Sequence, residues 1–378
     1  MELTSEDSLR LHVLVKTVDA IRIQDDAMVV HGLLLADGVL REARVVLHPN
    51  CRADQYLRRV RAFLSGAVLG SPGGYPVHLT RWTRMGQARD AGLAKLLMLG
   101  ELEAVAAVTS APGLTDELAR RVWWIAPTVE HARRMLERDS VVQGIMGPIL
   151  AAHLVEHLPF EGDGRLIVES VRLVLQPGLI DDSIRQHLWN EGHRHTAYHV
   201  GFLQALPEDL PQPRRARADL ARYREPLLAL VAQGNAMASM LLRILDTHGQ
   251  TFAEVGHRVL GRPGDSDVVA AMLNVIGHYF RDVAPAAPSE RDLAVIVGDA
   301  AAVCSVRGGS DSSLAELFQA VPDLACDIAA ILILSRVSEL VVGDILAHTT
   351  ATGALLQRKL APVTERIREQ FSVLIRTS

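Results

Sequence analysis

The sequence predicts a mainly α-helical protein with three parts: a small N-terminal α+β unit, a short α-solenoid-like array of helical repeats, and a C-terminal helical region. Three observations predict this fold class. Hydrophobic residues make up 49% of the 378-residue chain but aromatic residues only 4%, so the core must be mostly aliphatic, which suits helices. Strand-like apolar runs are confined to the N-terminal part, and one segment recurs after 65 residues. The length corresponds to about two or three domains.

The N-terminal unit, residues 1–88, contains the strand signals. Acidic residues at the start of segment 5–16 predict a short helix. Three short apolar runs follow at Ala20–Ile23, Met28–Leu35 and Val39–Leu47, and an Asp-Gly pair separates the last two. Because Asp-Gly between such runs favours a tight turn, we expect a β-hairpin there.

The second half of this unit contains a glycine-rich loop. An amphipathic helix is predicted over 52–64, the loop Gly70–Pro76 follows, and Val77–Trp82 is predicted to return as a strand. The loop follows a helix, and it lacks the Gly-Lys-Ser/Thr and Gly-x-Gly-x-x-Gly patterns of phosphate sites. Two of its residues are prolines without a donor N–H, so a structural turn is favoured over a phosphate-binding site.

A 65-residue repeat predicts the helical array of residues 89–206. Six residues recur at this spacing: Pro112, Gly113, Leu114, Asp116, Arg120 and Trp124 match Pro177, Gly178, Leu179, Asp181, Arg185 and Trp189. In each copy the Pro-Gly pair is predicted to end one helix, and Asp116 or Asp181 to cap the next. The two tryptophans occupy equivalent positions, which favours a packing role. Stacked units of this kind form solenoids.

The predicted helices of the array are connected by short segments rich in proline, glycine and aspartate. They cover 90–99, 101–110, 116–125, 128–138, 148–158, 165–175, 181–190 and 194–205. The proline-rich segment 206–214 is predicted to be a linker, and the C-terminal region is assigned to 215–378, with a possible division near 285–289. Its predicted helices cover 215–222, 226–246, 250–260, 267–282 and much of 290–373.

Histidines and serines are the first candidates for chemistry. His195 and His199 would lie one turn apart on a helix and could share a metal ion, but no acidic or cysteine residue at a fixed spacing completes a site. We therefore predict no metal and no cofactor. The loop Gly308–Ser313 lacks the Gly-x-Ser-x-Gly pattern of a hydrolase nucleophile, so its polar residues are interpreted as a helix cap, as are those of Asp265–Asp267.

Arginine groups and one tryptophan are the candidates for binding. Arginines cluster at 58–61, at 133–138 and at 214–224, the last beside the predicted linker. Interleaved aromatic residues are nearly missing and acids accompany the second and third clusters, so ion-paired faces are favoured over RNA binding. The interface candidates are Trp82, Arg214, Arg215, Arg217 and Arg222.

Charge and cysteine content limit the function classes. The net charge of −5 argues against general phosphate neutralisation of nucleic acid. Three cysteines lack metal or redox spacing, and Cys304 and Cys326 are predicted to be buried in apolar helices. The apolar stretch Leu324–Leu346 contains four charged residues and predicts a buried helix pair. With no signal pattern at the N-terminus, these features indicate a cytoplasmic protein.

Five segments have a distinctive order of residues: Tyr56–Arg61, Leu64–Val77, Arg81–Gln87, Ala111–Arg121 and Ser170–Ile180. Together they resemble the DsrS family, soluble accessory proteins encoded at the end of the dissimilatory sulfite reductase (dsr) gene cluster of sulfur-oxidising bacteria. The resemblance covers about residues 5–210 and carries no catalytic or binding residue. It implies a cytoplasmic accessory role in sulfur oxidation, beside a sirohaem sulfite reductase. It does not imply sirohaem binding, because the cysteine spacing for an adjacent iron–sulfur cluster is absent.

Three functional hypotheses follow. The first is a non-catalytic accessory or regulatory protein of dissimilatory sulfur oxidation, which contacts a protein partner through its helical array. The sulfite reductase system is the candidate source of that partner. The second is a post-transcriptional regulator that contacts RNA through an arginine-rich face, which the net charge disfavours. The third is a small sulfur-handling enzyme that uses a free cysteine, Cys51, Cys304 or Cys326.

Overall fold

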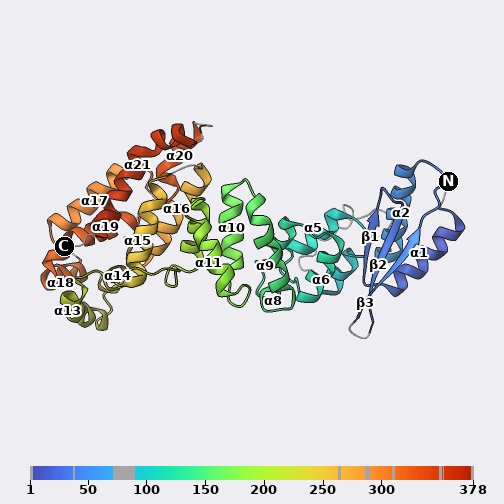
Figure 1. The fold of residues 1–378 in the computed structure, drawn as a ribbon, viewed down its shortest axis with the longest axis horizontal. Coiled ribbons are helices and arrows are strands. Elements are labelled where there is room, and N and C mark those ends of the chain that lie inside the picture. Colours follow the sequence, from blue (N-terminus) through green and yellow to red (C-terminus); the bar gives the residue numbers. More distant parts are fainter. Residues whose placement is uncertain are drawn as a thin grey trace. The chain divides into compact units, whose positions relative to one another are not determined.

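The computed structural model describes residues 3–36, 39–70, 90–262, 265–285, 290–308, 311–348, 351 and 353–375. It confirms the predicted fold class: one three-stranded antiparallel sheet lies near the N-terminus, and helices make up most of the remaining described chain (Figure 1). The chain divides into two compact units, Met1–His157 and Leu158–Ser378, which are described separately below.

The first unit begins with the predicted α+β arrangement. Its elements are α1 (Ser5–Thr17), β1 (Ala20–Gln24), β2 (Val29–Ala36), β3 (Val39–Val46) and α2 (Ala53–Leu69). The strands pair in the order β1-β2-β3, and the antiparallel pairing of β2 with β3 confirms the hairpin. Buried side chains from both helices and the sheet form one core, with Leu11, Ile21 and Tyr56 fully buried. Gly32 allows α1 to pack closely, because a Cβ there would lie 2.6 Å from Val18 Cγ1.

Short helices complete the first unit. They are α4 (Asp90–Leu96), α5 (Leu102–Ser110), α6 (Asp116–Ile125), α7 (Val129–Met135), α8 (Asp139–Val142) and α9 (Met146–His157). The bounds of α6 agree with the sequence prediction, whereas the four-residue α8 was not predicted. Helix α5 packs against α6 and α7, and α7 packs against α9. The predicted strand Val77–Trp82 and most of the Gly70–Pro76 loop lie outside the described residues.

The described part of the second unit is all helical. It contains η1 (Leu158–Phe160), α10 (Gly164–Val174), α11 (Asp182–Glu191), α12 (Thr196–Ala205), α13 (Leu220–Ala232), α14 (Ala236–Leu245), α15 (Thr247–Leu260), α16 (Ser266–Tyr279), η2 (Arg281–Val283), α17 (Leu293–Ser305), α18 (Ser312–Ala320), η3 (Pro322–Leu324), α19 (Ala325–Leu334), α20 (Leu340–Ala347) and α21 (Gly353–Leu374). Within the described residues no single helix is long and apolar enough to span a membrane; α18 and the stretch Pro322–Leu334 reach that length together, but with a bend of 111° between them.

Two predicted helices of the second unit differ in the structure. Residues 215–219 are not helical, because α13 begins only at Leu220. The helix predicted over 226–246 is broken between α13 and α14, where Gly234 adopts a φ of +85°. That conformation favours glycine and ends α13, and the side chain of Asn235 then caps α14 by accepting a hydrogen bond from the N–H of Ala238.

The grouping of the helices differs from the three predicted regions. One boundary, at His157/Leu158, falls inside the region predicted as 89–206. Beyond it, α10 and α12 both pack against α16, so residues 164–205 share a core with the region predicted to begin at 215. Periodicity and proline content mark local breaks, whereas these contacts between segments distant in sequence decide which helices pack together.

The two copies of the 65-residue repeat begin their helices differently. Asp181 caps α11 as predicted, and its carboxylate accepts from the N–H of Ile184. The equivalent prediction for Asp116 is wrong, because the side chain of Thr115 caps α6. Asp116 instead accepts hydrogen bonds from the N–H groups of Ile145 (3.1 Å) and Met146 (2.9 Å), at the start of α9. It therefore joins two helices within the first unit.

The repeated tryptophans also differ. Trp189 is 2% exposed and packs edge-on against the ring of Phe202, with centroids 5.1 Å apart. Trp124 is only half-buried, and the guanidinium of Arg22 on β1 lies 4.9 Å from its ring centroid. The predicted packing role therefore fits both tryptophans. Trp189 packs in a helical core, whereas Trp124 packs against the guanidinium of Arg22 on the sheet.

The contact of Asp116 with α9 gives a test of stability. We expect Asp116→Ala to lower the free energy of unfolding by about 1 kcal/mol, because two backbone N–H groups lose their acceptor. Urea unfolding of the full chain, followed by circular dichroism, measures this change. Asp116→Asn keeps an acceptor oxygen and should retain most of the stability. Equal losses in both variants would contradict the hydrogen-bonding explanation.

Candidate functional site

The predicted interface arginines do not form a common free surface. Trp82 lies outside the described residues. Arg214 is paired with Glu254, and Arg222 lies 2.5 Å from the carboxylate of Asp323. Arg215 is exposed. Since acids neutralise most of this group, it offers less positive surface than its sequence suggests.

Arg217 is a buried structural residue. Its side chain is 5% exposed, and its guanidinium binds the carboxylates of Asp219 and Asp327. Asp219 is two residues away, whereas Asp327 lies on α19 and is 8% exposed. A further hydrogen bond reaches the carbonyl of Leu374, at the end of α21. Arg217 is therefore inaccessible to a partner, although the arginine cluster around it in the sequence suggested an interface.

A different set of arginines lines a cleft of about 870 Å³ in the second unit. Its walls come from α10, α12, α14, α16 and η2. The charged lining residues are Arg165, Glu169, Arg172, Arg243, His278, Arg281 and Asp282. The four arginines outnumber the two acids, although the whole chain has a net charge of −5. We name this feature the basic cleft.

Two arginines of the basic cleft are already engaged. The guanidinium of Arg243 lies 3.9 Å from the ring centroid of Tyr279, hydrogen bonds to the carbonyl of that residue and pairs with Glu208. Tyr279 is 4% exposed and stacks on Phe252, and burial raises its pKa above the ordinary value. Arg281 lies 3.5 Å from Asp282 in an exposed pair. Both arginines therefore have acidic partners within the described structure.

The other two arginines are free within the described structure. Arg165 and Arg172 lie on α10 seven residues apart, which places them two turns apart on one face. Arg165 is exposed and Arg172 is half-buried, and neither has an acidic partner among the described residues. Val168 and Val275 supply apolar surface between the charges. The cleft can therefore bind a negatively charged group beside apolar atoms.

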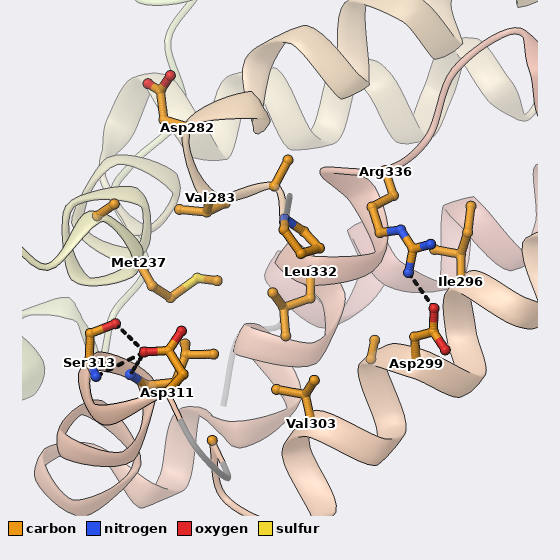
Figure 2. Close-up of a pocket in the computed structure, with 16 residues that line it drawn as sticks. Met237, Asp282, Val283, Ile296, Asp299, Val303, Asp311, Ser313, Leu332 and Arg336 are labelled. Atoms are coloured by element: carbon orange, nitrogen blue, oxygen red, sulfur yellow. Dashed lines mark hydrogen bonds and ion pairs between the residues drawn. The ribbon is translucent and has the colours of Figure 1, made fainter. Parts of the chain in front are cut away.

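A second cavity, of about 500 Å³, is mainly apolar (Figure 2). Its apolar lining includes Met237, Val283, Ile296, Val303 and Leu332. Figure 2 shows that two of its acids already have partners: Arg336 donates to Asp299 at 2.6 Å, and the hydroxyl of Ser313 donates to Asp311 at 2.7 Å. Asp311 also caps α18, as the sequence predicts for this loop, and Asp265 caps α16 in the same way. These acids therefore have structural roles.

The cysteines differ from their prediction. Cys326 is exposed and Cys304 is half-buried, so the prediction that both are buried is wrong. Cys326 lies in the first turn of α19, near the start of the apolar stretch Leu324–Leu346 rather than in its middle. Burial, and next the neighbouring Cys326, raise the pKa of the Cys304 thiol. A raised pKa reduces the thiolate fraction at neutral pH, which weighs against Cys304 as a nucleophile.

The candidate pair His195 and His199 is not arranged to share a metal ion. His195 precedes the first turn of α12 as its N-cap residue, and His199 is 1% exposed, with a ring that faces Trp189. A different group was missed: His153, Glu156 and His157 on α9 place one ligand atom each within 4.8 Å of one another. The run His-Leu-Val-Glu-His in the sequence was the signal that could have identified it.

Comparison of the chain with protein-family models, with curated proteins and with solved structures finds no match.

Proposed function

We propose that this chain is a non-catalytic accessory protein of dissimilatory sulfur oxidation that works in the cytoplasm. Its basic cleft receives an acidic segment of a partner protein, and the sulfite reductase system supplies the partner. The observation that carries the binding role is the pair of free arginines, Arg165 and Arg172, in a cleft of an otherwise acidic chain. The resemblance to the DsrS family supports the metabolic context.

A protein segment fits the basic cleft better than RNA. RNA recognition uses exposed aromatic faces on which bases stack. The aromatic residue among the described residues of the cleft wall, Tyr279, is 4% exposed and already stacks on Phe252. Apolar side chains beside the charges, such as Val168 and Val275, suit a peptide that carries both carboxylates and apolar groups.

Charge reversal in the cleft tests the proposal. The double variant Arg165→Glu, Arg172→Glu should weaken binding to purified dissimilatory sulfite reductase at least about tenfold, because like charges then face the acidic segment. Surface-immobilised wild-type and variant chains give the dissociation constants. Wild-type binding should also weaken as salt is added, since the attraction is screened.

The double variant Arg215→Glu, Arg224→Glu is the matched control, because both arginines are exposed but lie outside the basic cleft. It should leave binding nearly unchanged. An equal loss in this control would show a general charge effect and refute the cleft as the site. Binding of single-stranded RNA that the double variant abolishes would favour the regulator hypothesis instead.

A further inference from the structure

The C-terminal turns of α9 bring two imidazoles and a carboxylate together. His153, Glu156 and His157 stand at positions i, i+3 and i+4, which share one face of a helix. One ligand atom from each residue lies within 4.8 Å of the other two. Among the described residues this is the one group of three histidine, cysteine or acidic side chains close enough to hold a metal ion.

The ring of His157 is oriented for coordination. Its Nδ1 lies 2.9 Å from the carbonyl oxygen of His153, and because a carbonyl oxygen only accepts, Nδ1 carries the proton in the neutral ring. The lone pair is then on Nε2, the atom left for a metal. A histidine that donates its other N–H to a carbonyl is a common arrangement in metal sites.

The ring of His153 is held by its neighbours. It packs edge-on against Trp123, with centroids 4.7 Å apart, and lies 4.0 Å from the ring of His157. Glu156 is exposed and can turn its carboxylate toward the same position.

We infer that His153, Glu156 and His157 bind one late first-row divalent cation of the Zn²⁺ class. Two imidazole nitrogens and one carboxylate oxygen suit Zn²⁺ and its neighbours better than Mg²⁺ or Ca²⁺, which prefer oxygen ligands alone. With three protein ligands, a tetrahedral ion keeps one position for water or another ligand. The spacing His-x-x-Glu-His also occurs in a class of zinc enzymes, where the two histidines hold the metal.

Metal titration of the full chain tests the site. Isothermal titration with Zn²⁺ should show a single site with affinity on the order of micromolar. Co²⁺ should give the visible absorption of a four-coordinate ion. The double variant His153→Ala, His157→Ala should lose at least about tenfold in affinity and the Co²⁺ spectrum.

Two further variants separate coordination from folding. Glu156 is exposed, so Glu156→Gln should fold normally yet bind Zn²⁺ more weakly. His193→Ala, His195→Ala removes two exposed histidines elsewhere and should bind as wild type does. Wild-type affinity retained in both site variants would overturn the assignment. An equal loss in the His193/His195 control would overturn it too, since binding would then be general to exposed histidines.

Discussion

Replacing Arg217 with alanine is expected to lower the free energy of unfolding by about 3–5 kcal/mol. The guanidinium is buried between Asp219 and Asp327, and it also reaches the carbonyl of Leu374. It thus connects the segment before α13 with α19 and α21. The large effect does not measure the attraction of the ion pair alone; it arises because Asp327, 8% exposed, would keep a buried charge without a partner.

The same substitution should change the pH dependence of stability. Burial already raises the pKa of Asp327, and Arg217 opposes that rise. Without the arginine the pKa of Asp327 should rise further. The folded state then binds a proton more tightly than the unfolded state, so the stability of the variant should decrease as pH rises through the folded-state pKa. Wild-type stability should respond less over the same range.

Urea unfolding at several pH values measures both effects. Arg222→Ala is the matched control: its pair with Asp323 is exposed on both sides, so the loss should stay within about 1 kcal/mol. The variant Arg217→Met, Asp327→Leu removes both charges and should recover most of the stability. If Arg217→Ala costs no more than the control, Arg217 does not organise this core.

Local signals in the sequence predicted the elements well. The α6 bounds, the hairpin of β2 and β3, and the caps at Asp265 and Asp311 depend on residues a few positions apart. Such short-range chemistry acts in the same way in most folds, so it can be read without knowledge of the tertiary contacts.

The partners of charged residues could not be predicted in the same way. Arg217 and Asp327 are 110 residues apart, and Asp116 serves a helix that begins 30 residues later. Nothing in the local pattern distinguishes Arg217 from the exposed Arg215. The free arginines of the basic cleft could not be identified from the sequence either, because whether an arginine is free or paired depends on which acids lie near it in the folded chain.

The histidines show how a small shift in a helix changes a site. His195 and His199 have the same spacing as His153 and His157, but α12 begins at Thr196, so His195 lies before the first turn. The buried face of α12 then carries His199 into the core. On α9 both histidines lie within the helix and remain partly exposed. The spacing of the residues cannot distinguish the two histidine pairs, whereas their burial in the folded chain does.

The stability of the protein is expected to decrease as pH falls from about 6.5 toward 3, in part because of His199. Burial, and next the charge of Arg258 and the neighbouring His193, lower the pKa of His199 to about 3, while an unfolded histidine titrates near 6.5. Between these values the unfolded state binds the proton and the folded state does not. The contribution of this residue is therefore complete above pH 6.5 and is lost with acid, by about 2 kcal/mol at pH 5.

The structure around His199 explains why its imidazole stays neutral in the folded state. The ring is 1% exposed and lies edge-on to Trp189, with centroids 4.6 Å apart. A Cβ at Gly192 would lie 2.4 Å from its Cδ2, so the chain closes directly over the ring and leaves no space for water there. A charged imidazolium in this position would lack the solvation that stabilises it in the unfolded chain.

Thermal or urea unfolding of His199→Leu between pH 7 and pH 5 isolates this contribution. The substitution changes the stability at pH 7 by its own packing effects, so the comparison concerns the slope with pH rather than the absolute value. The leucine variant should lose about 2 kcal/mol less than wild type over this interval. His195→Leu, at an exposed position, should keep the wild-type slope. A leucine variant with the wild-type slope would show that His199 accepts its proton in the folded state, and hence that the core around it opens to water.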